Sequence, residues 1–180
     1  MSSIDFLEPR VRPTWSVLEW GCGSSTLWWA SRTQQVLSVE HDPDWHQLIA
    51  AETPPNATVS LAEDLDRYVE LPHRHSASPF DAIVIDGEHR NECARLAISL
   101  IRPDGIIIFD NSDRKMYRDG LTHLMNAGWQ RLDFFGLIPS YLYRNCTSIF
   151  YRNTDFLKPA TLPCDHQSSL GPTCAQVMGE

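Results

Sequence analysis

The chain has 180 residues, of which 42% are hydrophobic and 21% charged, a composition typical of a single soluble globular domain. Fifteen basic against 23 acidic residues give a net charge of −8, and the basic residues form no cluster, which disfavours binding to nucleic acid or to an anionic membrane. The five cysteines never form a CxxC pair, and no apolar run approaches the roughly 18 residues that span a bilayer. We therefore expect a soluble, cytoplasmic protein.

Five β-rich runs alternate with helix-like stretches, a pattern typical of a parallel α/β sheet. AIVI and IIIF, within the fourth and fifth runs, are continuously apolar, as expected of central parallel strands that helices cover on both faces. The five runs are WSVLEW from Trp15, QVLSVE from Gln35, ATVSL from Ala57, FDAIVID from Phe80 and GIIIFD from Gly105.

Two further strands, four helices and a C-terminal tail are predicted from the spacing of apolar residues and from the positions of glycine and proline. Two further strands, WQRLDFF and CTSIFYR, are separated by a connection, residues 136–145, that suits an antiparallel pair better than a crossover. We expect one domain over residues 1–152 and a poorly ordered tail over residues 153–180, which is rich in Pro, Ser, Thr and Cys. The spacing predicts helices over residues 24–32, 44–52, 91–102 and 116–127.

The segment VLEWGCGSST carries the strongest chemical signal. It predicts a strand that ends in Glu19, a turn through Gly21 and Gly23, and a helix that opens with hydroxyl side chains. Glycines in such a turn allow a ligand to approach the backbone closely. The helix N-terminus, together with the hydroxyls of Ser24, Ser25 and Thr26, is suited to hold a carboxylate or phosphate.

A second acid, Glu40, ends the second predicted strand, where a nucleotide-binding sheet places a carboxylate on ribose hydroxyls. Glu19 at the end of the first strand is unfavourable beside a pyrophosphate, because both are negatively charged. The pair therefore favours a nucleoside ligand that carries an ammonium group.

On VLEWGCGSST and VLSVEHD the chain resembles the class I S-adenosylmethionine-dependent methyltransferases. The resemblance implies a Rossmann-like, doubly wound sheet of order 3-2-1-4-5-7-6 with an antiparallel seventh strand. It further implies that Glu19 serves the amino-acid end of the cofactor and that Gly21 and Gly23 line it. For the nucleoside, it implies that Glu40 binds the ribose, His41 flanks the adenine, and Asp64, or the adjacent Glu63, contacts the adenine amino group.

Polar residues also follow the fourth and fifth strands. Asp86, Asp110 and Asn111 supply oxygen donors that suit Mg²⁺, and this arrangement is similar to that of the catechol O-methyltransferases. The match is incomplete, because the first motif is one residue shorter than in the catechol O-methyltransferases and almost no helix precedes the first strand. Asp110 and Asn111 are also common turn and helix caps, so the metal site competes with a capping role.

The segment IDGEHR is similar to a broader group of small-molecule and sugar methyltransferases, in which a histidine after the fourth strand is a candidate base. Here that residue is His89, and we predict that His89 and Asp86 form the catalytic pair, with Asp86 also touching the cofactor. A solvent-exposed helix-start role is the alternative for His89. Methyl transfer chiefly needs alignment of the two reactants, so a base is optional.

The function predicted from these residues is S-adenosylmethionine-dependent methylation of a small-molecule acceptor on a hydroxyl oxygen, with or without Mg²⁺. A nicotinamide-dependent Rossmann oxidoreductase is the first alternative, although Thr26 replaces the third glycine of GxGxxG. A non-catalytic cofactor-binding protein is the second. The sequence sets neither the acceptor nor the oligomeric state.

Overall fold

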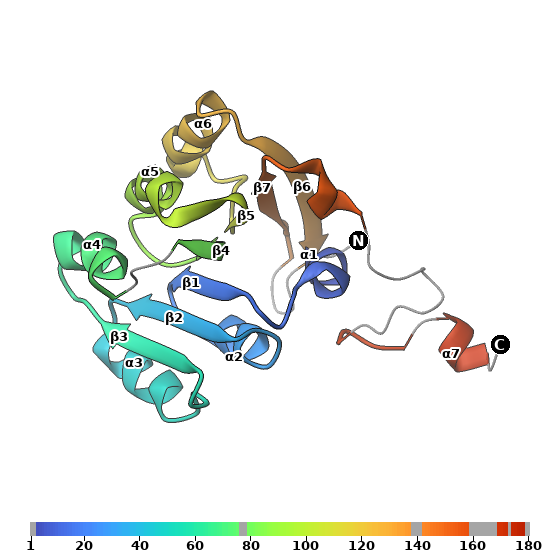
Figure 1. Ribbon diagram of the computed structural model, residues 1–180, viewed down its shortest axis with the longest axis horizontal. Coiled ribbons are helices and arrows are strands. Elements are labelled where there is room, and N and C mark those ends of the chain that lie inside the picture. The colour runs from blue at the N-terminus through green and yellow to red at the C-terminus, as the bar shows by residue number, and fades with distance from the viewer. Residues whose placement is uncertain (1–2, 76–78, 138–141, 159–168, 173, 179–180) are drawn as a thin grey trace.

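The computed structural model describes residues 3–75, 79–137, 142–158, 169–172 and 174–178, and its centre is a seven-stranded sheet of order β3-β2-β1-β4-β5-β7-β6 (Figure 1). Strands β1 to β5 pair in parallel, and β7 pairs antiparallel with both β5 and β6. The predicted sheet order and antiparallel last strand are therefore confirmed. The strands are β1 (Ser16–Trp20), β2 (Gln35–Glu40), β3 (Ala57–Leu61), β4 (Phe80–Ile85), β5 (Ile101–Phe109), β6 (Gln130–Leu137) and β7 (Arg144–Tyr151).

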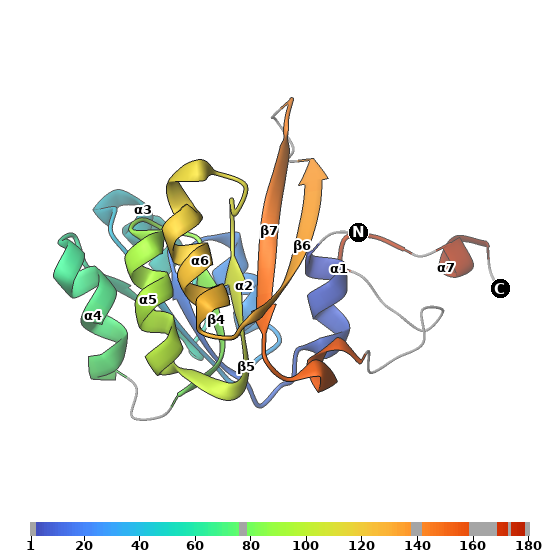
Figure 2. The ribbon, with the colours of Figure 1, turned by 90° about the horizontal axis from the view of Figure 1, so that it is seen from above.

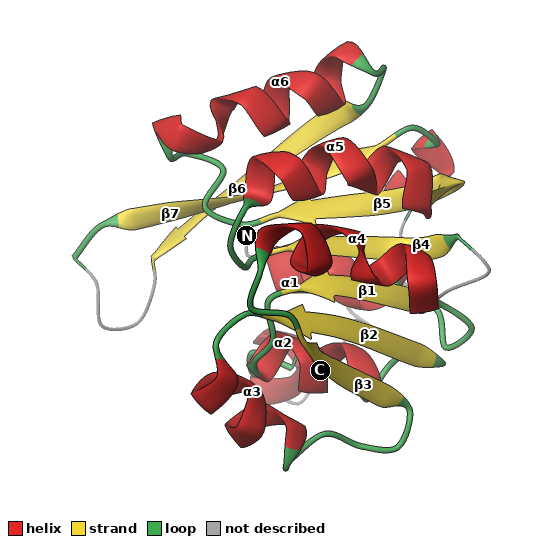
Figure 3. Cartoon of the chain, turned by 90° about the vertical axis from the view of Figure 1, so that its left-hand side faces the viewer, coloured by secondary structure: helices red, strands yellow, loops and turns green. Residues whose placement is uncertain are grey.

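Helices cover both faces of the sheet (Figure 3). One face carries α4 (Leu65–His75), α5 (Arg90–Leu100) and α6 (Arg118–Asn126). The other carries α1 (Ser3–Leu7), α2 (Ser24–Ala30) and α3 (Pro43–Ala50). This double cover explains why the central strands are apolar at every position rather than at alternate ones.

Alternate residues of each central strand enter two separate cores. In β5, Ile107 and Phe109 pack with α4, α5 and α6, whereas Ile106 and Ile108 pack on the face that carries α1 and α2. All four residues are 5% exposed or less. The period of two along a strand therefore builds two cores from one apolar run.

The structure differs from the sequence prediction around β5 and α4. The helix expected over residues 91–102 ends at Leu100, and β5 begins at Ile101. Helical geometry is unfavourable for Arg102 because it precedes Pro103, and Ile101 pairs with Phe80 in the sheet. Helix α4 was not predicted. It contains Pro72, which disfavours a helix interior, yet Tyr68 on its inner face is fully buried.

The antiparallel pair of β6 and β7 extends beyond the rest of the sheet (Figure 2). Its outer part is apolar and exposed at Phe135, Leu137 and Leu142. Residues 138–141, which join the two strands, lie outside the described residues. The inner part of β7 is different, because Ile149 and Phe150 are fully buried against β5.

The chain beyond β7 keeps some contacts with the domain. The short helix η3 (Thr154–Leu157) packs its apolar side chains near Phe6, and the Ser169 amide donates a 2.8 Å hydrogen bond to Glu8. Helix α7 (Cys174–Met178) lies apart from the sheet (Figure 1). The division at residue 152 stays a prediction. No described helix combines the length and apolar character needed to span a membrane.

Candidate active site

A cleft of about 360 Å³ opens at the carboxyl ends of β1, β2 and β4. This edge of a parallel sheet is where open α/β folds bind ligands. The structure brings Gly21, Glu40, His41 and Asp86 of the predicted site to this cleft. Its lining is Gly21, Cys22, Glu40, His41, Asp42, Trp45, Asp86, Gly87, Glu88, Arg90, Arg114 and Tyr117.

Two glycine backbones touch at the base of the cleft. Gly21 has a φ of +95°, and a Cβ atom there would lie 2.9 Å from the Gly87 nitrogen. A Cβ atom at Gly87 would lie 2.8 Å from the Gly21 nitrogen and would overlap the Tyr68 hydroxyl. The loops after β1 and β4 therefore meet closely because neither residue has a side chain.

Glu19 does not line the cleft, because its side chain points into the protein and the residue is 1% exposed. Its carboxylate accepts hydrogen bonds from the hydroxyls of Ser25 and Thr26, both at 2.5 Å, and from Ser38 at 2.9 Å. Burial raises the pKa of Glu19, and the three hydroxyls oppose that shift. This network joins β1, β2 and the first turn of α2.

Two of the hydroxyl residues at the start of α2 thus bind the buried Glu19 carboxylate and not a group in the cleft. Thr26 is fully buried and also accepts a 3.0 Å hydrogen bond from the Gly23 amide. Ser24 is exposed. Gly23 and Ser24 do not contribute to the cleft lining, so their predicted role in cofactor binding stays a prediction.

Glu40 lies at the cleft wall and is 4% exposed. Its carboxylate accepts the backbone amides of Cys22 at 3.1 Å, His41 at 2.8 Å and Asp42 at 3.0 Å. The His41 ring lies on the same carboxylate, with Nδ1 2.8 Å from Oε1. Glu40 therefore ties the loop after β2 to the loop after β1, a structural role that sequence reasoning missed.

A tryptophan on α3 forms one rim of the cleft. Trp45 donates its indole N–H to the Cys22 carbonyl at 2.7 Å and remains 45% exposed. Asp42 caps the same helix by accepting the amides of Asp44 and Trp45. The sequence HDPDW contains an Asx cap before proline, which is a recognisable signal for this helix start.

Arg90 connects the loops after β4 and β5 and was also missed. Its guanidinium donates to the carbonyls of Asp86 at 2.8 Å, Gly87 at 2.8 Å and Asp110 at 2.5 Å, and Nη2 lies 3.1 Å from the Asp86 carboxylate. The residue is 7% exposed and stacks over the Tyr117 ring. A cation at the first position of a helix is electrostatically unfavourable. That unusual position of Arg90 was the sequence feature that could have indicated a structural role for it.

Asp86 lines the cleft beside Arg90. Loss of hydration raises the pKa of Asp86, the negative charge of Asp110 raises it further, and Arg90 acts in the opposite direction. Two carboxyl groups therefore come together at the ends of β4 and β5, as the sequence predicted for a parallel sheet.

The predicted metal ligands after β5 have other partners. The Asp110 carboxylate accepts the Thr147 hydroxyl at 2.6 Å, and the Asn111 amide donates to Asn145 at 2.7 Å. Both partners lie on β7. Within the described residues, no three His, Cys, Asp or Glu side chains are arranged to hold a metal.

His89 and Asp64 lie outside the cleft lining. His89 precedes α5 with a φ of 51°, and its ring packs edge-on against Tyr68, 6.1 Å between centroids. His41 packs against the same tyrosine. Asp64 caps α4 by accepting the Arg67 amide at 2.8 Å. The catalytic role of His89 and the adenine contact of Asp64 stay predictions.

Comparison with known proteins agrees with this geometry. Residues 18–112, more than half of the chain, match a family described as a methyltransferase domain. The chain therefore belongs to the methyltransferase domain family, and with its sheet order it is a class I, S-adenosylmethionine-dependent methyltransferase. No curated protein matches the chain.

Solved structures share the fold at low sequence identity. Spermidine synthase from Thermotoga maritima is 15% identical with a TM-score of 0.62, covering 86% of this chain and 58% of that chain. An N-methyltransferase from Bradyrhizobium japonicum in complex with S-adenosyl-L-homocysteine is 16% identical, with a TM-score of 0.56 and 82% of each chain covered. An rRNA methylase from Streptococcus thermophilus is 13% identical, with a TM-score of 0.56, covering 83% and 93%.

The contact between Gly21 and Gly87 gives a first prediction. Gly87→Ala should lower the free energy of unfolding by roughly 1–3 kcal/mol, because the new methyl group overlaps the Tyr68 hydroxyl. Gly23→Ala is the matched control, since a Cβ atom there has its nearest neighbour at 3.9 Å. Adding Tyr68→Phe should restore part of the loss. Equal urea midpoints for the two alanine variants would contradict the contact.

The buried carboxylate of Glu19 gives a second prediction. Because its pKa is raised on folding, the wild-type protein should lose stability relative to Glu19→Gln as pH rises above 4.5. The free energy of unfolding falls by about 1.4 kcal/mol for each unit by which the pKa of Glu19 in the folded protein exceeds its value in the unfolded chain. Urea unfolding of both proteins across pH 5 to 8 measures the difference. A difference that grows in favour of the wild type with rising pH would show that the three hydroxyls outweigh burial.

Proposed function

We propose that the cleft binds S-adenosylmethionine and that the protein methylates a small-molecule acceptor on a hydroxyl oxygen. The observation that carries this proposal is the convergence of Gly21, Glu40 and Asp86 on one cleft at the carboxyl ends of three parallel strands. S-adenosylmethionine supplies the methyl group. The chain supplies binding, orientation and a place for the acceptor's proton.

The cofactor's nucleoside half fits the wall formed by Glu40, His41 and Trp45. Glu40 is held by three backbone amides, so its carboxylate is fixed in place before a ribose reaches it. The Trp45 indole is anchored to Cys22 and remains 45% exposed, which leaves surface for a flat base. The touching backbones of Gly21 and Gly87 form the base of the cleft, against which the methionine half would lie.

The charge around the cleft supports a small acceptor over nucleic acid. Four lining residues are acidic against two arginines, and one of these arginines, Arg90, is already paired with Asp86. Such a wall attracts a sulfonium cofactor and repels a phosphate backbone. The lining acids are Glu40, Asp42, Asp86 and Glu88.

Asp86 is the residue that we propose accepts the hydroxyl proton. It lies in the cleft, and Arg90 fixes both its carbonyl and its carboxylate. His89 has a weaker claim, because its ring packs against Tyr68 outside the cleft lining. As the acceptor oxygen bonds to the methyl carbon, the carbon–sulfur bond breaks and the proton moves to Asp86.

Magnesium has less support than the cofactor. Of the predicted ligands, Asp110 and Asn111 are hydrogen-bonded to β7, and only Asp86 lines the cleft. These donors do not fit a metal shared with an acceptor, and the proposed reaction includes no metal step.

The proposal predicts the behaviour of Glu40. Glu40→Gln should weaken binding of S-adenosylhomocysteine roughly 10- to 150-fold, which corresponds to one charge-assisted contact. Isothermal titration measures the affinity, with the exposed Glu52→Gln as the matched control and NAD as the competing ligand. An unchanged affinity in a folded Glu40→Gln protein would remove Glu40 from the site, and binding of NAD alone would refute the methyltransferase ligand.

The class of methyl acceptor and the role of Asp86 as the base are tested together. Formation of S-adenosylhomocysteine should occur with hydroxylated metabolites or sugars, and not with amines or RNA alone, and it should persist in EDTA. With an acceptor so found, Asp86→Asn should lower kcat about 10²- to 10⁴-fold, and His89→Gln should change it little. Loss of turnover in EDTA, restored by Mg²⁺, would reinstate the metal. A larger loss in His89→Gln would transfer the role of base to His89.

A further inference from the structure

A second cleft, of about 350 Å³, lies at the edge of the sheet opposite the candidate active site. It is formed where β4 and β5 begin, by the segment that precedes β1 and by the chain that follows β7. Nothing in the proposed reaction uses it. Its lining is Pro9, Arg10, Val11, Arg12, Thr14, Trp15, Asp81, Arg102, Asp104, Gly105, Asn153, Asp155, Phe156 and Lys158.

Four lining residues are cationic, in a chain whose net charge is −8. Two of them are paired within the cleft wall. Arg102 lies 3.3 Å from the Asp81 carboxylate, and Lys158 lies 2.6 Å from Asp155. The charges of these two residues are therefore offset locally.

Arg10 is different, because its partners are neutral. Its guanidinium donates to the carbonyls of Phe6 at 2.6 Å, Phe156 at 3.1 Å and Leu157 at 2.9 Å, and it stacks on the Phe6 ring. Burial lowers the pKa of Arg10, and no carboxylate among the described residues forms an ion pair with it. These bonds also fix the guanidinium at the cleft wall.

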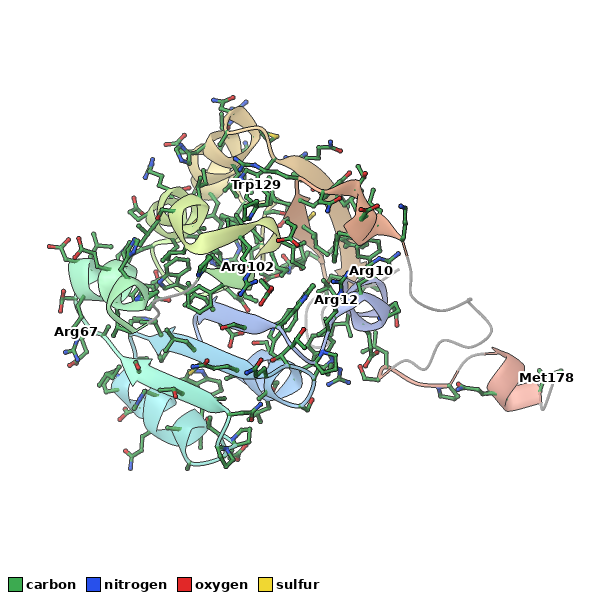
Figure 4. The ribbon with its side chains drawn as sticks, viewed as in Figure 1. Arg10, Arg12, Arg67, Arg102, Trp129 and Met178 are labelled. Atoms are coloured by element: carbon green, nitrogen blue, oxygen red, sulfur yellow. The ribbon has the colours of Figure 1, made fainter. Side chains whose placement is uncertain are left out.

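Arg12 has no ion pair or hydrogen bond from its side chain within the described part of the chain. Figure 4 shows Arg10, Arg12 and Arg102 together over this part of the sheet, with Arg67 far away on α4. Among the three lining carboxylates, Asp104 alone lacks a partner in the described structure. The cleft lining therefore includes two guanidinium groups and one carboxylate that form no ion pair with the described residues.

We propose that this second cleft is a binding site for a small oxyanion, a phosphate or carboxylate group, held chiefly by Arg12 with Arg10 fixed beside it. A guanidinium group presents paired N–H donors that match two oxygens of such a group. The half-buried Trp15 offers an apolar wall for the rest of the ligand. The site lies across the sheet from the methyl-transfer cleft and does not depend on the proposed function.

The test uses the full chain labelled with ¹⁵N and two probes, inorganic phosphate and acetate, at constant ionic strength with chloride as the comparison. The indole N–H resonance of Trp15 reports on the second cleft, and that of Trp45 reports on the candidate active site. We expect a saturable shift at Trp15, unchanged by saturating S-adenosylhomocysteine. Stronger binding of phosphate or of acetate identifies the preferred oxyanion.

Arg12→Ala should weaken that binding at least tenfold, whereas Arg67→Ala, which removes an exposed arginine elsewhere, should leave it unchanged. Asp104→Asn should strengthen it, because a competing negative charge is removed. The proposal is overturned if neither probe shifts Trp15 saturably, if Arg67→Ala weakens binding as much as Arg12→Ala, or if the saturable shift occurs at Trp45.

Discussion

The structure depends on one constraint, namely that the central strands are buried on both faces. Helices cover the two sides of β1, β4 and β5, so residues such as Ile83, Ile107 and Phe109 are apolar and fully enclosed. Polar groups inside such a sheet carry a large desolvation cost. Chemistry is therefore confined to the edges, where the strands end. Glu19 is a carboxylate buried inside the sheet, and three hydroxyl groups satisfy it.

The carboxyl edge is shaped by a few close contacts between loops. Gly21 and Gly87 allow the loops after β1 and β4 to touch, and Glu40 gathers the amides of the loops after β1 and β2. Arg90 joins the loops after β4 and β5 with its charge buried. A buried guanidinium with all these acceptors is costly to disturb, so Arg90 stabilises the two loops that form this part of the cleft wall.

The two edges of the sheet differ in charge. The cleft at the carboxyl edge is lined by four acids and two arginines, whereas the cleft at the opposite edge is lined by three acids and four basic residues. The net charge of −8 is a sum over the whole chain and does not reveal that the two edges differ. The proposed cationic cofactor and the proposed small anion therefore suit different sides of the same domain.

The apolar central strands and the glycines and acids at the strand ends could be read from local sequence pattern, and the sheet order followed from the resemblance to one family. The sequence did not determine which way each polar side chain points. Glu19 points inward, and Arg90 bridges the loops after β4 and β5. The second cleft joins segments more than 140 residues apart. Only the tertiary structure decides such pairings, because burial and hydrogen-bond partners arise from residues distant in the chain.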